Sequence, residues 1–231
     1  MSEQRYRQYC ALALALDVVG GRWTFLIVRE LWPGPRRFTD LVDGLPGISR
    51  KLLTERLRDL EEDGIITRKE LPPPAARQVY ELTADGRDLA AALIPLIGWA
   101  SKRLGKRKRG EDFRPRWAAV GMAALADRDA AKGVHETYQY LVGGSAFHLV
   151  VDDGSISVRD GESEDAVVVV TTDEQTWVDI VSGKITAGAA HASGAPTVEG
   201  DRQAAKRLRK IFARDLILSR AREGAFAPQR V

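Results

Sequence analysis

Basic and hydroxyl side chains share one face of a predicted helix that begins after Ser49. Leu53, Leu57 and Leu60 recur at the spacing of a buried helical stripe. The opposite face therefore presents Arg50, Lys51, Thr54 and Arg58. Arginine and lysine side chains donate hydrogen bonds to guanine edges and to phosphates, and threonine bonds to several bases. This helix thus has the chemistry to bind a DNA duplex.

The residues around Ser49 also predict how this helix starts. The Ser49 hydroxyl can serve as N-cap, and Ile48 can pack against Leu53 as a hydrophobic staple. The free N–H groups of the first turn favour an anion such as a phosphate. Further basic residues on the flanks are expected to contact the DNA backbone without reading sequence, namely Arg36, Arg37, Arg68, Lys69 and Arg77.

Apolar spacing and the positions of proline and glycine predict the neighbouring elements. We expect helices over 4–19, 22–31, 38–44 and 84–104, and a Pro-Gly turn over 45–48. We expect the two strands at 65–71 and 78–82 to be joined by a proline-rich loop. Two helices that meet at a short turn, followed by a hairpin, form a winged helix-turn-helix.

Several motifs in residues 6–105 resemble the HxlR family of winged-helix regulators, which are related in shape to MarR-type proteins. These motifs are GGRWT, FTDL, PGISRKLLTERL, LEEDGII and YELTADG, in that order. The resemblance implies a bacterial-type transcription regulator that binds an operator in double-stranded DNA as a homodimer. It implies recognition by Ser49, Arg50, Lys51 and Thr54, wing contacts by Arg77, and dimerisation through the first helix and the helix after the wing.

Cys10 is a candidate redox sensor, because some members of this family respond to oxidants or electrophiles through a cysteine at this position. The sequence departs from the family at Ala11, where proline is usual. The alternative is that the thiol only packs in an apolar helix. As the single cysteine, Cys10 cannot form an intrachain disulfide, and we expect a cytoplasmic protein.

The second half of the chain predicts an α+β domain. We expect helices at 116–131, 173–182 and 201–222, and strands at 146–152, 155–159, 166–172 and 197–199. Residues 150–212 resemble sterol carrier protein type 2, an SCP2-like fold in which helices and a sheet surround an apolar tunnel. The resemblance implies a hydrophobic or lipid-like ligand, lined by Phe147, Leu149, Trp177, Ile180 and Val181, although these residues can equally form the core.

Charge supports a division of the chain into two domains. Residues 1–116 carry 22 Lys and Arg against 16 Asp and Glu, whereas the remainder carries 13 against 16. The first part is therefore the one suited to a polyanion. We expect a DNA-binding and dimerisation domain over 1–104, a basic linker over 105–115 and an SCP2-like domain over 116–231.

The sequence favours a regulator over an enzyme. His135, His148 and His191 lie far apart and lack the spacing of metal ligands, and neither a nucleophile elbow nor a phosphate-binding glycine loop occurs. We expect no catalysis, metal, cofactor or membrane segment. The alternatives are a redox regulator with a structural C-terminal domain that serves dimerisation, and a lipid-binding carrier protein.

Overall fold

The computed structural model describes residues 6–71, 77–101, 103, 108–182 and 184–212. The chain divides into two compact units, Met1–Leu93 and Ile94–Val231, and the division falls inside a helix. Part of the predicted linker, residues 105–107, lies outside the described residues. Each unit is built around its own core.

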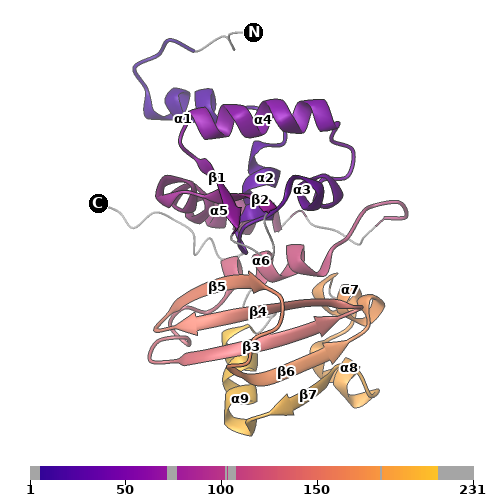
Figure 1. Ribbon diagram of the computed structural model, residues 1–231. Coiled ribbons are helices and arrows are strands. Elements are labelled where there is room, and N and C mark those ends of the chain that lie inside the picture. The colour runs from indigo at the N-terminus through magenta and orange to yellow at the C-terminus, as the bar shows by residue number, and fades with distance from the viewer. Residues whose placement is uncertain (1–5, 72–76, 102, 104–107, 183, 213–231) are drawn as a thin grey trace. The chain divides into compact units, whose positions relative to one another are not determined.

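The N-terminal unit holds the helices and the hairpin that the sequence predicts (Figure 1). Its elements are α1 (Ala11–Val19), α2 (Thr24–Leu31), α3 (Phe38–Gly44), α4 (Arg50–Glu62), β1 (Ile66–Leu71), β2 (Arg77–Leu82) and α5 (Ala84–Ser101), which continues past Leu93. The two strands are antiparallel, and the backbones of Arg36 and Tyr80 form an additional bridge beside them. This unit therefore has the element order of a winged helix-turn-helix.

The start of the first helix differs from the prediction. Helix α1 begins at Ala11 rather than near residue 4, and Cys10 before it has an extended backbone. The dense apolar run begins only at Ala11, whereas Tyr6 and Tyr9 are exposed. On α2, Leu26 is exposed, whereas Ile27, Val28 and Leu31 are buried.

Thr83 and Gly86 explain why the YELTADG motif closes the hairpin. The Thr83 hydroxyl accepts from the Gly86 N–H at 3.1 Å and donates to the Gly64 carbonyl at 2.6 Å. A Cβ at Gly86 would lie 2.0 Å from the Ile65 carbonyl oxygen. Only glycine allows α5 to approach the start of the wing this closely.

The C-terminal unit is a five-stranded sheet with helices (Figure 1). Its elements are α6 (Pro115–Leu125), β3 (His135–Val142), β4 (Ser145–Asp152), β5 (Ser155–Asp160), β6 (Ala166–Thr172), α7 (Glu174–Ser182), α8 (Ala187–Ala192), β7 (Thr197–Gly200) and α9 (Arg202–Ile211). The strand order is β5-β4-β3-β6-β7, with β3 parallel to β6 and the other pairs antiparallel. Helix α6 packs on β4 and β5, and α9 packs on β6 and β7.

The central strand β3 was not predicted, nor was the short helix α8. The run HETYQYLV alternates weakly, and Gly143 and Gly144, which follow it, form the turn into β4. Helix α6 ends at Leu125, before the predicted end at residue 131. The predicted extension of α9 beyond Phe212 lies outside the described residues.

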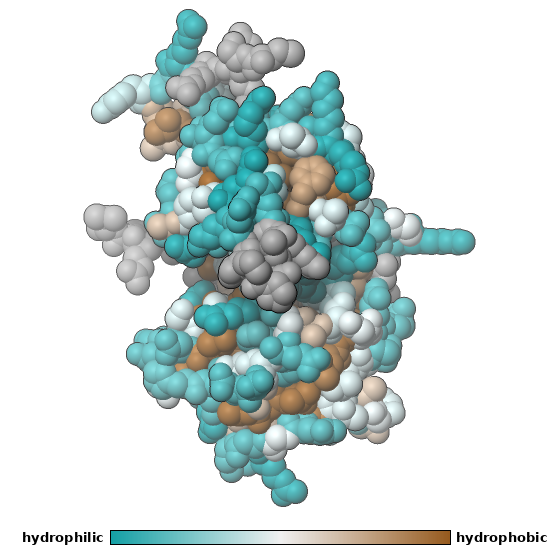
Figure 2. Space-filling view, viewed as in Figure 1, coloured by the Kyte–Doolittle hydropathy of each residue, from teal (hydrophilic) through white to brown (hydrophobic). Residues whose placement is uncertain are grey.

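The two faces of this sheet differ. Tyr138, Tyr140 and Phe147 are buried on one face. On the other face, the Gln139 amide donates to the Phe147 carbonyl at 2.9 Å and accepts from the Ser163 N–H at 2.8 Å, which fixes the β5–β6 connection. Hydrophobic surface shows between hydrophilic patches on the visible side of this unit (Figure 2).

Gly200 and Asp201 explain the VEGD junction between β7 and α9. A Cβ at Gly200, whose φ is +111°, would lie 2.2 Å from the Val167 carbonyl oxygen. The next residue, Asp201, donates its N–H to that carbonyl at 2.9 Å, and its carboxylate caps α9 by accepting from the Ala204 N–H at 2.6 Å. The motif therefore ties α9 to β6.

Within the described ranges, no single helix is long and apolar enough to cross a membrane. Helices α1 and α2 together pass on length and composition, but they are bent by 76° at the break between them.

Candidate functional sites

The start of α4 has the geometry that the sequence predicts. The Ser49 hydroxyl accepts from the Leu52 N–H at 3.2 Å, and Ile48 and Leu53 are both buried. Leu57 and Leu60 continue the buried stripe. The remaining predicted recognition side chains on α4 are all exposed, namely Arg50, Lys51, Thr54 and Arg58.

Among the described residues, Arg50 and Lys51 have only weak partners. The Lys51 ammonium lies 4.0 Å from the Glu55 carboxylate with 88% of its side chain exposed, and such pairs contribute little stability. The Arg50 guanidinium lies 6.0 Å from the centre of the Phe38 ring. Both cations therefore remain accessible to a polyanion.

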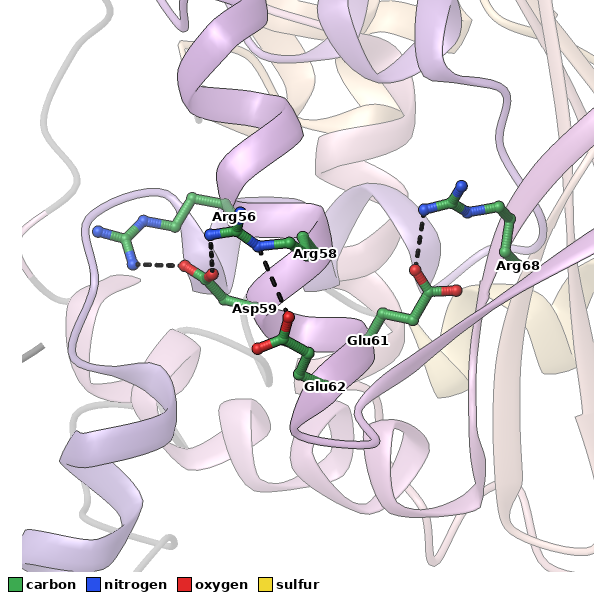
Figure 3. Close-up of polar contacts among 6 residues, drawn as sticks. All are labelled: Arg56, Arg58, Asp59, Glu61, Glu62 and Arg68. Carbon is green, nitrogen blue, oxygen red and sulfur yellow. Dashed lines mark hydrogen bonds and ion pairs between the residues drawn. The ribbon is translucent and has the colours of Figure 1, made fainter. Parts of the chain in front are cut away.

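The second half of α4 is charge-neutralised (Figure 3). Arg56 and Arg58 both point to the Asp59 carboxylate, at 3.5 and 3.3 Å, and Arg58 also lies 3.6 Å from Glu62. At the wing, Arg68 pairs with Glu61 at 2.9 Å. Accessible positive charge on α4 is therefore concentrated in its first turn.

The predicted flanking residues are in different environments. Arg36 is half-buried, and its Nε donates to the Glu30 carbonyl at 3.3 Å, which favours a structural role. Arg37 is exposed beside Asp40, whose carboxylate accepts from the Arg37 backbone and side chain. Lys69 pairs with Glu81 across the hairpin at 2.5 Å. The side chain of Arg77 lies outside the described residues.

Cys10 is exposed at the N-terminus of α1 rather than inside a helix. The backbone N–H groups of Ala13 and Leu12 interact with its sulfur and lower the pKa of the thiol. Helix N-termini stabilise a thiolate in this way. The predicted helix over 4–19 placed Cys10 within a helical turn, so the sequence did not indicate this effect.

Large apolar side chains are exposed on α1 and α5. Leu12, Leu14 and Leu16 are 67%, 66% and 39% exposed on α1, and Leu96 and Trp99 are 44% and 54% exposed on α5. Such surfaces in a single chain are typical of a protein–protein contact.

Three of the predicted ligand-lining residues are buried in the C-terminal unit. Phe147 and Leu149 are fully buried and Trp177 is 4% exposed, while Ile180 and Val181 are half-buried. Phe147 and Trp177 form an aromatic cluster with Tyr140, with ring centres 5.1 to 5.9 Å apart. Tyr140 was missed because it lies on the strand that the sequence did not predict.

A separate pocket of about 240 Å³ lies at the far ends of β3 and β4. It contains His135, whose Nδ1 lies 2.6 Å from the Asp152 carboxylate, and none of the predicted ligand-lining residues. In the described part of the chain, no group of three or more His, Cys, Asp or Glu side chains could hold a metal ion.

Comparison with known proteins assigns both halves of the chain. Residues 18–108 match the HxlR-like helix-turn-helix family, and residues 120–213 match the SCP-2 sterol transfer family. The HTH-type transcriptional regulator YodB of Bacillus subtilis is 38% identical over 88 residues, which are 38% of this chain and 79% of YodB. The chain belongs to the HxlR-like family.

Other relatives of this HxlR-like protein are also HTH-type transcriptional regulators. The uncharacterized regulator sll1512 of Synechocystis is 44% identical over 87 residues, 38% of this chain and 64% of that protein. Rv3095 of Mycobacterium tuberculosis is 46% identical over 107 residues, 46% of this chain and 66% of that protein. The protein therefore joins a DNA-binding helix-turn-helix domain of transcription regulators to an SCP2 domain in an α+β architecture.

Solved structures of similar regulators span the same half of the chain. Reduced YodB from Bacillus subtilis is 35% identical, with a TM-score of 0.38, and covers 41% of this chain and 94% of its own. A MarR family regulator from Enterococcus faecalis is 31% identical, with a TM-score of 0.38, and covers 45% and 94%. Both structures cover less than half of this chain.

Proposed function

We propose that this HxlR-like protein is a sequence-specific transcription regulator that binds an operator through the first turn of α4. The observation that carries the proposal is the capped helix start at Ser49, which exposes Arg50, Lys51 and Thr54 and leaves both cations weakly paired. In a helix-turn-helix, side chains at this position reach base edges in the major groove. A protein with this role acts at the chromosome, in the cytoplasm of a bacterial cell.

Each group at the proposed interface has a distinct task. Arg50 and Lys51 donate to base edges, and the Ser49 end of the helix holds a phosphate. Arg37 and Arg77 contact the DNA backbone, which orients the protein without reading sequence. Arg58 contributes less, because Asp59 and Glu62 already neutralise it.

The protein acts as a homodimer in this proposal. The apolar side chains exposed on α1 and α5 lose their contact with water when a second copy covers them. A symmetric pair presents two α4 helices to half-sites about one turn of DNA apart. The proposed DNA-binding and dimerisation domain spans 1–104 and the basic linker 105–115, and the two family matches lie mainly on either side of that linker.

The DNA-binding proposal is tested by selecting duplexes from a random pool with the purified full-length protein. We expect one enriched motif with two related half-sites, and genomic mapping of bound sites should return the same motif. The double variant Arg50→Ala with Lys51→Ala should lose the enrichment, while Lys132→Ala, an exposed lysine of the other unit, should retain it. Retention of DNA without any enriched motif would contradict sequence-specific binding.

We further propose that residues 116–231 bind a hydrophobic small molecule that modulates operator binding. The SCP-2 family match and the aromatic cluster of Tyr140, Phe147 and Trp177 support this proposal. Native mass spectrometry of the purified protein, followed by solvent extraction, should find a bound apolar molecule. If a molecule binds but operator affinity is the same with and without it, the domain binds ligands and has no regulatory role.

A redox regulator that acts through Cys10 is the second candidate function. The exposed thiol with a lowered pKa favours it, as does the similarity to YodB, for which reduced, diamide-treated and quinone-bound structures exist. Diamide would accept two hydrogen atoms from the Cys10 thiols of two copies, leaving one intermolecular disulfide. Loss of operator binding on diamide treatment, absent in Cys10→Ser, would support this candidate; an equal response of both proteins would exclude it.

A further inference from the structure

Two buried polar side-chain atoms in the C-terminal unit have no hydrogen-bond partner. Among the described residues of this unit, they are the Thr172 Oγ1 and the Trp177 Nε1. Thr172 is 8% exposed and Trp177 is 4% exposed, so water does not reach them freely. Burying a donor without a partner costs free energy, and such atoms in native proteins call for an explanation.

Both atoms belong to one corner of the unit, where β6 passes into α7. Thr172 is the last residue of β6, and the backbone N–H of Trp177 donates to the backbone carbonyl of Asp173 in the first turn of the helix that follows. In the sheet register Thr172 lies opposite Val142, two residues beyond Tyr140, so its side chain shares the buried face with Tyr140. The Trp177 ring lies 5.4 Å from the ring of Tyr140.

The rings that surround the Trp177 indole are uncharged, and the charged residues that follow Thr172 in the sequence, Asp173 and Glu174, are acidic and exposed. The Trp177 indole packs against the rings of Tyr140 and Phe147, which are both buried. Burial alone raises the pKa of Tyr140, so the phenol stays neutral. An anion placed here would be buried without a compensating cation, which costs far more than burying a neutral oxygen.

We propose that this corner, defined by Thr172 and Trp177, binds the carbonyl oxygen of a neutral apolar molecule. The Trp177 indole N–H donates one hydrogen bond to that oxygen, and the Thr172 hydroxyl donates a second. The aromatic cluster contacts the apolar remainder of the molecule. This inference rests on the proposed ligand-binding function of the SCP2 domain and specifies the ligand as a ketone, ester or amide rather than a hydrocarbon or a fatty carboxylate.

The test compares three probes of similar size on the full-length protein labelled with nitrogen-15 in its tryptophan indoles. The probes are benzylacetone, which has a neutral carbonyl, butylbenzene, which has no acceptor, and hydrocinnamate, which is an anion. We expect benzylacetone to move the Trp177 indole proton resonance downfield and to bind about thirtyfold more tightly than butylbenzene, the factor for two net hydrogen bonds. Hydrocinnamate should bind more weakly than benzylacetone.

Matched variants identify the donors. Trp177→Phe keeps an aromatic ring and removes the N–H, and it should remove most of the preference for benzylacetone over butylbenzene, leaving the part that the Thr172 hydroxyl contributes. Thr172→Val, which is nearly isosteric, should reduce that preference without removing it. The control is Trp117→Phe: Trp117 is a half-buried residue of α6, and its replacement should leave the preference unchanged. Circular dichroism and thermal unfolding establish whether each variant is folded. If Trp177→Phe does not fold, the comparison of Thr172→Val with the wild type still tests the proposal.

The outcomes separate this inference from the function on which it rests. If benzylacetone and butylbenzene bind equally and both variants bind them as the wild type does, the carbonyl site is wrong while hydrophobic ligand binding stands. An indole resonance that shows contact with a trapped water and no response to benzylacetone would also overturn the carbonyl site. If none of the probes binds, the ligand-binding proposal fails together with this inference.

Discussion

The two units of this protein place their proposed functional groups in opposite environments. In the N-terminal unit the groups lie on the surface, where buried Leu53 and Leu57 hold a helix whose other face exposes Arg50 and Lys51. In the C-terminal unit they lie inside, where Trp177 is both part of the core and a hydrogen-bond donor without a partner. A surface site separates stability from function, whereas an internal site makes the same side chain serve both.

The largest expected effect comes from the buried stripe that supports the surface site. Leu57→Ala should lower the free energy of unfolding of the N-terminal unit by about 2–5 kcal/mol, because it leaves a cavity in the core. Thermal and urea unfolding measure the change. Leu26→Ala is the control, since Leu26 is 39% exposed and its truncation should cost much less. Equal losses would show that burial does not separate these two leucines.

Truncating Arg50 or Lys51, the residues proposed to contact bases, should weaken DNA binding without affecting folding. Arg50→Ala or Lys51→Ala should each weaken operator binding by about 1–3 kcal/mol relative to random DNA, the value of one base contact. Arg77→Ala should weaken binding to both duplexes alike, because it removes a backbone contact. Fluorescence anisotropy at a fixed salt concentration measures all three. Equal, sequence-independent losses would make Arg50 and Lys51 anchors rather than readers.

Variants of the N-cap residues of α4 and α9 separate an effect on helix stability from an effect on DNA binding. Ser49→Ala and Asp201→Ala each remove a cap that accepts a backbone N–H, and each should cost about 1 kcal/mol of stability. Ser49→Ala should also weaken operator binding, because it loosens the helix start that holds the phosphate. Asp201→Ala should leave operator affinity unchanged. A matching loss of affinity in Asp201→Ala would mean that general destabilisation explains the Ser49 effect.

The smallest effect is expected at Arg58. Its guanidinium is 64% exposed but lies 3.3 Å from Asp59 and 3.6 Å from Glu62, so its charge is largely neutralised before DNA arrives. Arg58→Ala should change operator affinity by less than a factor of about two, within the range of surface substitutions. Glu62→Gln should instead tighten binding slightly, because it frees Arg58. If Arg58→Ala lowers operator affinity as much as Arg50→Ala does, the DNA-contacting face of α4 extends beyond its first turn.

The sequence predicted the N-terminal unit more fully than the C-terminal unit for a physical reason. Helix α4 is specified locally by a cap at Ser49, a leucine stripe and the stop at Gly64, and α3 was predicted to the residue. Strand β3 lies between β4, the next strand along the chain, and its parallel partner β6, which follows only after β4 and β5, and its own apolar pattern was too weak to identify it. Tyr140, at the centre of the aromatic cluster, was lost with it.

The sequence by itself determined the family, the α+β class, and the helix that presents Arg50, Lys51 and Thr54, because these depend on short-range spacing and capping. Tertiary structure alone decided that Arg68 of the wing pairs with Glu61 of α4, whereas the Arg58–Glu62 pair follows from i,i+4 spacing along one helix. It also decided that Cys10 is exposed and that Thr172 and Trp177 share a buried corner. These properties depend on which side chains the folded chain brings together, and one-dimensional spacing does not contain that information.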